Sequence, residues 1–501
     1  MRIGLSLLCL FSCYITASHA QTDVDALRYS MTSVQGTARN IALGNTMGTI
    51  GADISAVSTN PAGLAKFSSA EFTLSPAVSI NKSSSLFLGN TSSYNKTKFQ
   101  LTNLGVVIAG KSTGTSETKK WNGIRFGFAL TRTANFNSKY YFSGYNTKNS
   151  LLNAYYEKLN DRSYITDSTD AADNYPFDAS IAYQLGLITI DSLGNTYTAT
   201  NNGNMQQSFV VEKSGGINEL ALGIGSMYKD KIMVGVSVGV PILNYTERIK
   251  LTEEDIRDSA YDLNSFINET YLKTTGVGFN LKVGIIGMPI PNLRLSLAFQ
   301  TPGILFMKDA YQTYMEADYE SQQVIFTGQS PEGGSKYKFI QPWKMTAGIG
   351  YIHKYGLLAA EYELSDAANA RFRFNLNEVN ARAYENYVNN LIKGKYGLLH
   401  TVRAGVEFKY KQVRFRGGIQ YRTSPFKSAA APSEINTSAL TYSAGLGYRG
   451  NHFFADIAYV QTNTKEMYLP YQLSTESWKP VPAAILSTKK PAIVVTVGYK
   501  L

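Results

Sequence analysis

The sequence predicts an all-β protein, namely a transmembrane antiparallel β-barrel of about 14 strands with a small N-terminal helical plug. One observation is the recurrence of segments of about ten residues in which apolar residues alternate with small or polar ones. A second is that short and long connections follow each other in turn along the chain. The third is composition, because 34 Tyr and 42 Gly stand beside only 17% charged residues. This combination favours an alternating barrel over a soluble enzyme or a helical membrane protein.

Residues 1–20 have the features of a secretory signal peptide. Arg2 supplies a positive charge, residues 3–10 form a short apolar stretch, and small residues occupy the cleavage positions. A lipoprotein cleavage site is the weaker alternative for the same segment. Cys9 and Cys13 both lie in this segment, and the sequence has two cysteines in total. The processed chain would therefore contain neither a disulfide nor a Cys-ligated metal.

Residues 21–70 lack the strand rhythm of the rest of the chain and are predicted to form the plug, or hatch. Near its end, the sequence SAVSTNPAGLAKF at 55–67 contains a helix start. The side chain of Asn60 can accept a hydrogen bond from the first helical turn, and Pro61 suits the first helical position because no N–H is needed there. Ala62 is small. We therefore expect these three residues to hold a compact turn that fits inside a narrow space.

Residues 71–501 are predicted to form the barrel wall with long extracellular loops. Apolar side chains occupy one face, and small or polar ones the other, in GIRFGFALT (123–131), LRLSLAFQ (293–300), VRAGVEFKY (402–410) and the C-terminal PAIVVTVGYKL (491–501). Ten tilted residues at ~3.3 Å each cover roughly 25 Å of membrane height. A pair of packed soluble sheets is the alternative explanation of this alternation.

The lengths of the connections alternate from the third strand onward. Short turns are expected at 228–231, 288–292, 353–356, 409–412 and 449–451. Long loops are expected near 134–216, 242–272, 301–340, 367–399, 423–439 and 462–490. Bacterial outer-membrane barrels sort their connections in this way, with tight periplasmic turns and long external loops.

Two loop segments are predicted to be helical. Residues 251–267 have acidic residues in the first turn and apolar residues at helical spacing. Residues 377–394 place Val379, Ala383 and Tyr387, together with Leu391, on one side. These apolar sides either pack the loops or line a groove that collects apolar molecules.

The chemistry-bearing residues do not form a recognisable catalytic or metal site. After residue 20 the histidines are His353, His400 and His452, and none has a partner at metal-ligand spacing. The chain has neither a nucleophile elbow nor a phosphate-binding glycine loop with a Lys. We therefore expect no enzyme activity, no metal and no cofactor.

The net charge of +11 is expected to lie partly in the barrel lumen. Strand alternation points a set of cations inward, among them Arg294, Arg403, Arg414 and Arg416. One interpretation is that they pair with carboxylates such as Glu361, Glu363 and Glu407. The other is that unpaired members attract an anionic headgroup, because a cation in a narrow low-dielectric space binds anions well. Nucleic-acid binding is disfavoured, since the cations alternate within strands.

The chain resembles the FadL-type outer-membrane transporters of long-chain fatty acids and aromatic hydrocarbons. The resemblance lies in GADISAVSTNPAGLAKF, which is similar to the hatch motif of that family, and in VGVSVGVPI (234–242), LSLAFQTPG (295–303) and RFRGGIQYRTSP (414–425). It implies a fourteen-stranded barrel whose N-terminal hatch blocks the lumen. It also implies a substrate that binds outside and leaves sideways into the membrane through a wall gap. The family residues carried over are Asn60, Pro61 and Ala62 of the hatch.

These observations lead to one function hypothesis and two alternatives. The hypothesis is passive, hatch-gated uptake of hydrophobic small molecules by a monomer in the bacterial outer membrane, in contact with membrane lipid and lipopolysaccharide. The first alternative is a surface-exposed binding protein, such as an adhesin, that uses Tyr-rich loops, with Tyr140, Tyr141, Tyr145, Tyr155 and Tyr156 in the first of them. The second alternative is a hydrophilic porin.

Overall fold

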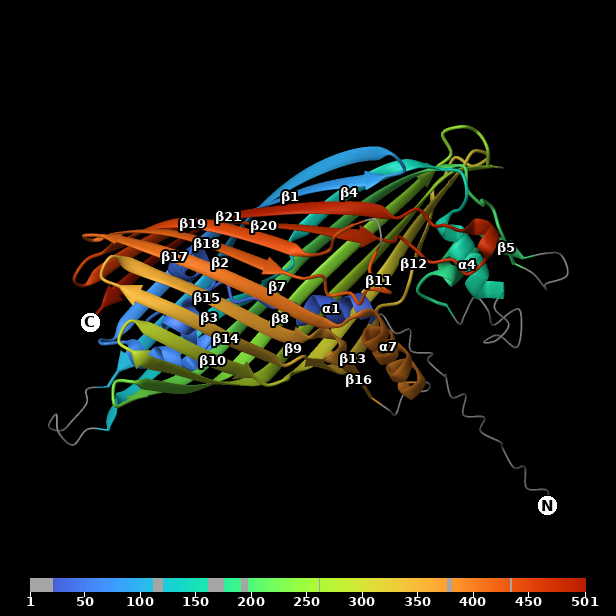
Figure 1. Ribbon diagram of the computed structural model, residues 1–501. Helices are drawn as coiled ribbons and strands as arrows, with labels where there is room; N and C mark the ends of the chain where they lie inside the picture. The colour runs from blue at the N-terminus through green and yellow to red at the C-terminus, as the bar shows by residue number, and fades with distance from the viewer. Residues whose placement is uncertain are drawn as a thin grey trace, which may run out of the picture.

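The computed structural model describes most of the chain (Figure 1). The described ranges are 21–110, 120–160, 175–190, 197–260, 262–375, 381–432 and 435–501. The predicted signal peptide, residues 1–20, lies outside the described residues.

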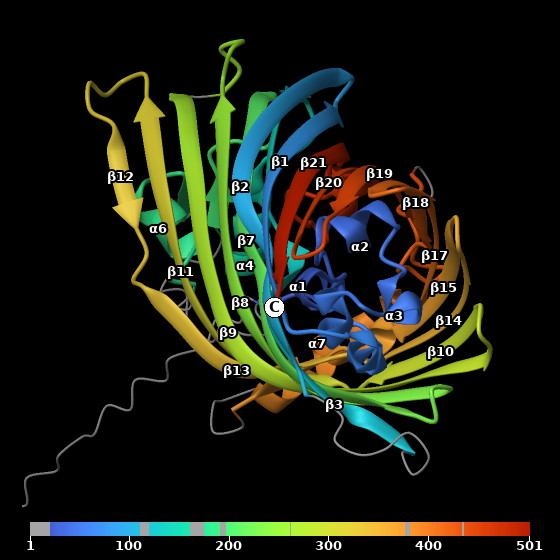
Figure 2. The ribbon, with the colours of Figure 1, turned by 90° about the vertical axis from the view of Figure 1, so that its left-hand side faces the viewer.

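Fourteen antiparallel wall strands close into a barrel, which confirms the predicted fold class (Figures 1 and 2). Ten wall strands are single elements: β1 (Glu71–Phe87), β2 (Asn90–Ala109), β7 (Met205–Tyr228), β8 (Ile232–Glu254), β9 (Leu263–Ile290), β17 (Leu398–Tyr410), β18 (Val413–Arg422), β19 (Ala439–Arg449), β20 (Phe453–Tyr468) and β21 (Ala484–Lys500). Four are interrupted and comprise β3 (Trp121–Asn135) with β4 (Ser138–Asn146), β10 (Leu293–Gln300) with β11 (Gly303–Tyr319), β13 (Gly333–Gln341) with β14 (Lys344–His353), and β15 (Gly356–Asp366) with β16 (Arg371–Phe374). Pairing of β21 with β1 closes the ring.

The outer face of the wall is apolar, as the alternation predicts. On β10 the exposed side chains are Leu295, Leu297 and Phe299, while Arg294 and Ala298, which alternate with them, are buried. The last strand likewise exposes Ile493, Val495, Val497 and Tyr499. Apolar side chains facing outward and polar ones facing inward are what a closed sheet in a bilayer requires. None of the helices in the described ranges could itself span a bilayer.

Two of the predicted long loops are wrong, because the strands continue through them. β8 and β9 pair as far as Glu254 and Ser265, and β11 pairs with β9 from Ile304 to Tyr319. The short strand β12 (Phe326–Gln329) adds to β11. Segments 242–272 and 301–340 are therefore mostly wall, since their alternation continues beyond the apolar belt with polar residues on the outer face.

The helix predicted at 251–267 is also wrong. The segment contains the end of β8, a turn and the start of β9. The carboxylate of Asp255 accepts hydrogen bonds from main-chain N–H groups within residues 257–260, so it caps a hairpin turn instead of a helix. Leu251 and Phe266 are buried from the two sides of that turn. Strand pairing and burial thus outweigh a weak local helical pattern.

The second predicted helix exists, but its buried side differs from the predicted one. Helix α7 spans Ala381–Lys395 and so ends one residue beyond the predicted 377–394, while residues 376–380 lie outside the described ranges. Its buried apolar side chains are Val388 and Ile392, whereas Tyr387 is 60% exposed. The helix therefore packs the barrel mouth through Val388 and Ile392.

The hatch occupies the lumen as a chain of short helices (Figure 2). Its elements are α1 (Asp23–Ser30), α2 (Ala38–Ala42), α3 (Met47–Ile50) and the 3-10 helices η1 (Ile54–Ser58) and η2 (Pro61–Lys66). Three of them contact different parts of the wall: α2 lies against β18 to β21, α3 against β10, β14 and β15, and η2 against β7, β8 and β9. The hatch thus touches most of the ring.

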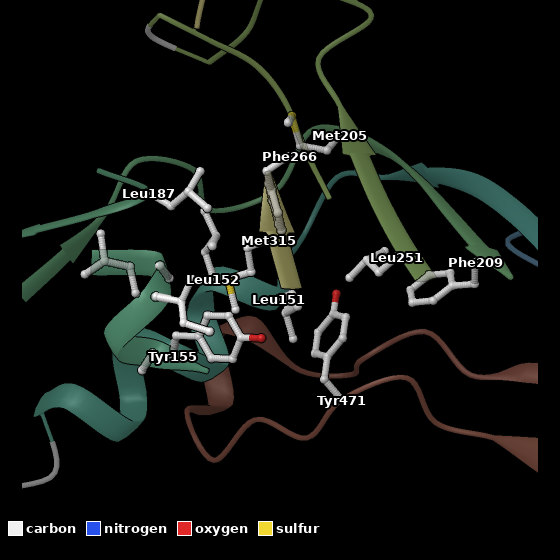
Figure 3. Packing of buried hydrophobic residues seen from close by; sticks show 14 of the residues in the cluster. Leu151, Leu152, Tyr155, Leu187, Met205, Phe209, Leu251, Phe266, Met315 and Tyr471 are labelled. Carbon is white, nitrogen blue, oxygen red and sulfur yellow. The ribbon is translucent and has the colours of Figure 1, made fainter. Parts of the chain in front are cut away.

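The loop end of the barrel is covered by packed segments. They include α4 (Leu151–Asn160), α6 (Ala179–Gln184), β5 (Ile188–Ile190), β6 (Tyr197–Ala199), η3 (Ala367–Asn369) and η4 (Glu476–Trp478). Figure 3 shows the apolar cluster between these loops and the strand ends, with Leu151, Leu152 and Tyr155 of α4 beside Tyr471. Tyr140 and Tyr155 of the Tyr-rich loop are buried here, and are thus part of this packing.

Candidate functional site

Asn60 caps η2, the last helical element of the hatch. The Asn60 side-chain oxygen accepts the hydrogen bond of the Ala62 N–H at 3.2 Å, and Pro61 is the first helical residue, as the sequence predicts. All three are buried. Two wall glycines leave the space for them. A Cβ on Gly284 would lie 1.9 Å from Asn60 Oδ1, and one on Gly235 would lie 2.3 Å from the Pro61 carbonyl carbon.

Helix α3 is held to the wall through its last two residues. Glu361 of β15 accepts hydrogen bonds from the N–H and the hydroxyl of Thr49, at 2.8 and 2.9 Å. Arg294 of β10 donates to the carbonyl of Ile50, the last residue of the helix. Charge-assisted hydrogen bonds of this kind are the stronger ones. These two wall side chains therefore fix the middle of the hatch.

A small polar cavity lies between the hatch and the wall. Its volume is about 60 Å³, and its lining includes hatch residues 32–34, the cap residue Asn60, and Thr133 of β3. Lys282 and Glu219 form a buried ion pair on its wall, with 2.7 Å between the charged atoms. A cavity of about 150 Å³ binds benzene, so this space is too small for an apolar solute of that size.

An aromatic cluster surrounds Tyr29 of the hatch helix α1. Tyr29 of α1 contacts Phe136, Tyr245 and Phe339 edge-on, with ring centroids 5.8 to 6.2 Å apart. The guanidinium of Arg28 lies 4.2 Å from the centre of the Tyr245 ring. Phe136 stands between β3 and β4. One hatch side chain thus contacts the interruption of a wall strand directly.

Main-chain pairing of the wall stops beside this cluster. β2 pairs with β3 only from Asn103 to Ala109, and β4 pairs with β7 alone among the described strands. The loop end of the β1–β2 hairpin arches over β4 (Figure 1). Side chains of β1 replace the missing ladder by donating to main-chain carbonyls at and beside β4; the pairs are Asn81 with Asn137, Ser83 with Lys139 and Ser85 with Tyr141. We call this place the wall break.

The hatch reaches the wall break through residues 33–35. The N–H of Ser33 donates to the Thr133 carbonyl at 2.8 Å, and the N–H of Gln35 to the Arg132 carbonyl at 2.9 Å. The side chain of Gln35 accepts a hydrogen bond from Gln100, which lies on β2 beyond its pairing with β3. The same short segment therefore borders the cavity and the wall break.

Solved structures of other proteins have a similar architecture. No family model matches the sequence, and no curated protein matches it significantly. Among solved structures, a FadL homologue of Pseudomonas aeruginosa is 11% identical, covers 94% of this chain and 99% of its own, and has a TM-score of 0.54. The toluene transporter TodX of Pseudomonas putida is 12% identical, covers 94% and 100%, and has a TM-score of 0.51. The chain has the FadL-type barrel fold.

The four cations predicted for the lumen of this FadL-type barrel have different partners in the structure. Arg403 pairs with Glu363 at 2.9 Å, and Arg416 pairs with Glu407 and Asp456 at 2.7 Å each. Arg414 lies at the turn end, where it donates to the carbonyls of Lys411 and Val413. Arg294 holds the hatch. The pairing interpretation therefore describes Arg403 and Arg416.

Sequence reasoning missed the residues that shape this FadL-type site. The wall glycines and the clamp on α3 were not predicted, and the family resemblance implied a wall gap without giving its position. Inward-facing glycines in wall strands were the available signal for the first, since a missing side chain on a lumen face makes room for another segment. The clamp and the break depend on register between distant strands, for which a single sequence holds no comparable signal.

Proposed function

We propose that this FadL-type barrel is a channel for passive uptake of hydrophobic small molecules across a bacterial outer membrane. The observation that carries the proposal is the wall break beside the aromatic cluster and the hatch. Each CH₂ group costs about 0.8 kcal/mol to transfer into water, so an apolar solute gains from a route that leads sideways into lipid. The P. aeruginosa FadL homologue and the P. putida toluene transporter support the substrate class.

In this proposal the structure is the closed state. The cavity of about 60 Å³ must enlarge before a solute enters, and residues 32–34 line it next to Thr133 of β3. Releasing this segment from β3 breaks the two hydrogen bonds made by Ser33 and Gln35. Each such bond has a net worth of about 1 kcal/mol, which thermal motion and a bound solute can offset. Asn60, Pro61 and Ala62 keep the remainder of the hatch in shape.

Arg294 is a lumen cation that a further movement, that of α3 away from β10, would expose. Its Nε is buried and has no hydrogen-bond partner within the described part of the chain, and its Nη1 is held by Ile50. Once α3 moves away, that guanidinium would face the lumen. We therefore assign the anionic headgroup of a fatty acid to Arg294, and a structural role to Arg403 and Arg416, which already have carboxylate partners.

A disulfide between the hatch and the wall tests this route. Both Ser33 and Thr133 line the cavity, and their main chains are hydrogen-bonded. The two native cysteines lie in the predicted signal peptide, so Ser33→Cys with Thr133→Cys introduces one defined pair. We expect the oxidised double variant to lose uptake of labelled oleate and toluene in cells, and a reductant to restore it.

The single variants Ser33→Cys and Thr133→Cys are the controls, and should transport in both redox states. Full uptake by the completely cross-linked protein would show that the segment does not need to move, and would overturn the hatch-gated route. Steady ionic conductance of the wild-type protein in planar bilayers would favour the hydrophilic porin instead.

A further inference from the structure

The outer face of β8, β9, β11, β13 and β16 carries an amphipathic surface, separate from the hatch and the wall break. Two rows of side chains cross these strands, and each row joins residues that lie directly opposite in the ladders. The row nearer the turn end consists of Ile242, Val277, Phe306, Lys338 and Arg373. The row nearer the loop end contains Asn244, Thr275, Lys308 and Lys336. Backbone alternation turns both rows outward.

Four cations of these rows form what we call the outer basic patch: Lys308, Lys336, Lys338 and Arg373, all exposed. Lys308 lies directly opposite Lys336, and Lys338 directly opposite Arg373. Like charges in directly opposite positions of a sheet destabilise it. Within the described residues, Arg373 has a carboxylate partner in Glu385, while Lys308, Lys336 and Lys338 form no ion pair. The patch therefore lacks most of its counter-charge.

The patch lies at the loop-side edge of the apolar belt. Along β9 the outward side chains Leu281, Phe279 and Val277 are apolar, and Thr275 and Lys273 follow them. Phe306 on β11 is likewise followed by Lys308 on the same face. Successive outward residues are about 7 Å apart along a strand, so the cations begin immediately above the hydrocarbon. In an outer-membrane barrel the loop end faces outward, and this is the level of outer-leaflet headgroups.

The surface is also concave. Both rows line one concavity of about 860 Å³ on the outer face. Its apolar part is formed by Ile242, Val277 and Phe306, and its polar part by the lysines and Arg373. The Lys338 ammonium lies 5.6 Å from the centre of the Phe306 ring, so the two parts are in contact. A ligand that fits must combine an apolar portion with anionic groups at one end.

We propose that the outer basic patch binds the phosphorylated, acylated lipid moiety of lipopolysaccharide in the outer leaflet. Its acyl chains lie along Ile242, Val277 and Phe306, and its phosphates lie between the opposed cations. Phosphate supplies the missing counter-charge, and Lys and Arg near a membrane surface attract anionic headgroups. The proposal rests on the outer-membrane location given under the proposed function, and is independent of transport.

Binding to purified full-length protein in a neutral detergent tests the proposal. The probe is rough lipopolysaccharide, either with its phosphates or after phosphatase treatment, and the dissociation constant is measured. We expect phosphorylated lipopolysaccharide to bind at least about tenfold more tightly than the dephosphorylated form. The variant Lys308→Gln, Lys336→Gln, Lys338→Gln should lose that difference, and the corresponding Lys→Arg variant should keep it.

A matched control variant changes three exposed lysines on other strands, Lys98→Gln, Lys465→Gln and Lys489→Gln, and should bind like wild type. Equal loss in this control, or equal affinity for both forms of the lipid, would overturn the proposal. Tight binding of inorganic phosphate alone, abolished by the same Lys→Gln changes, would reduce the patch to a simple anion site. Oleate and toluene uptake by the Lys→Gln patch variant should equal that of wild type. Failure of the disulfide test, which concerns transport, would therefore not change the interpretation of lipopolysaccharide binding.

Discussion

At the residue scale, the hatch depends on wall positions that have no side chain. Gly284 and Gly235 of neighbouring strands lie against Asn60 and Pro61, so closely that no β-carbon could be accommodated without movement. Protein interiors are close-packed, and an added methyl group at such a contact displaces one partner. The wall strands are constrained by main-chain ladders on both sides, whereas η2 is held mainly by packing and single hydrogen bonds. The hatch is therefore the partner that moves.

Substitution Gly284→Val should open the lumen. The new Cβ would stand 1.9 Å from Asn60 Oδ1, so Asn60 must release its cap on Ala62 and η2 must shift. We expect ionic conductance in planar bilayers where the wild-type protein is silent. Gly287→Val on the same strand is the matched control, because nothing lies within 4 Å of a Cβ there. A folded Gly284→Val protein as silent as wild type would contradict the close fit.

At the element scale, the hatch and the wall are stabilised by different bonds. Except at the wall break, wall strands exchange main-chain hydrogen bonds with two neighbours, whereas the hatch helices are short and contact the wall through a few side chains. Isolated helices of this length are not stable in water. Contacts such as Glu361 with Thr49 therefore determine whether α3 forms at all.

The substitution Glu361→Ala should loosen α3 without opening the barrel. It removes the acceptor of the Thr49 N–H, and hydrogen bonds to charged groups contribute about 1.5–3 kcal/mol. We expect amide hydrogen exchange in peptides covering 45–52 to accelerate at least about tenfold. Glu363→Ala is the control, since that carboxylate pairs with Arg403 and not with the hatch. Equal acceleration in both variants would mean that general lumen charge, and not the clamp, holds α3.

At the scale of the whole molecule, stability requires closure. β21 pairs with β1 on one side and with β20 on the other, so it completes the ring. Without it two strand edges would lie in hydrocarbon with unpaired main-chain groups, each of which costs several kcal/mol. The ring is asymmetric, with long strands from β7 to β11 and short ones from β17 to β19. The wall break and the outer basic patch both lie on the side of the long strands.

Deleting residues 494–501 should therefore prevent formation of a stable barrel. The truncated chain loses the part of β21 that pairs with Glu71 to Ala77 of β1 and with the first residues of β20. We expect the compact, fast-migrating form seen on unheated denaturing gels of folded barrels to disappear. A truncation of Leu501 alone removes an exposed residue outside the strand, and should migrate like wild type. Normal migration of the longer truncation would show that closure through β21 is dispensable.

The sequence by itself determined the barrel, its apolar outer face, the N-terminal plug and the cap at Asn60. These features follow from local patterns, because alternation along a strand and the choice of a capping residue involve neighbours in the chain. It predicted the wrong structure at 251–267, where a local helical pattern competes with strand pairing to residues far along the chain. It also left open whether the lumen cations were paired.

The tertiary structure decided what depends on register. Whether Arg403 meets Glu363, whether β4 has a main-chain neighbour, and whether Lys308 faces Lys336 are set by how distant strands align. A shift of one residue would turn each of these side chains to the other face of the wall. The fold was therefore available from local alternation, whereas the wall break and the outer basic patch arise only when the ring closes in this one register.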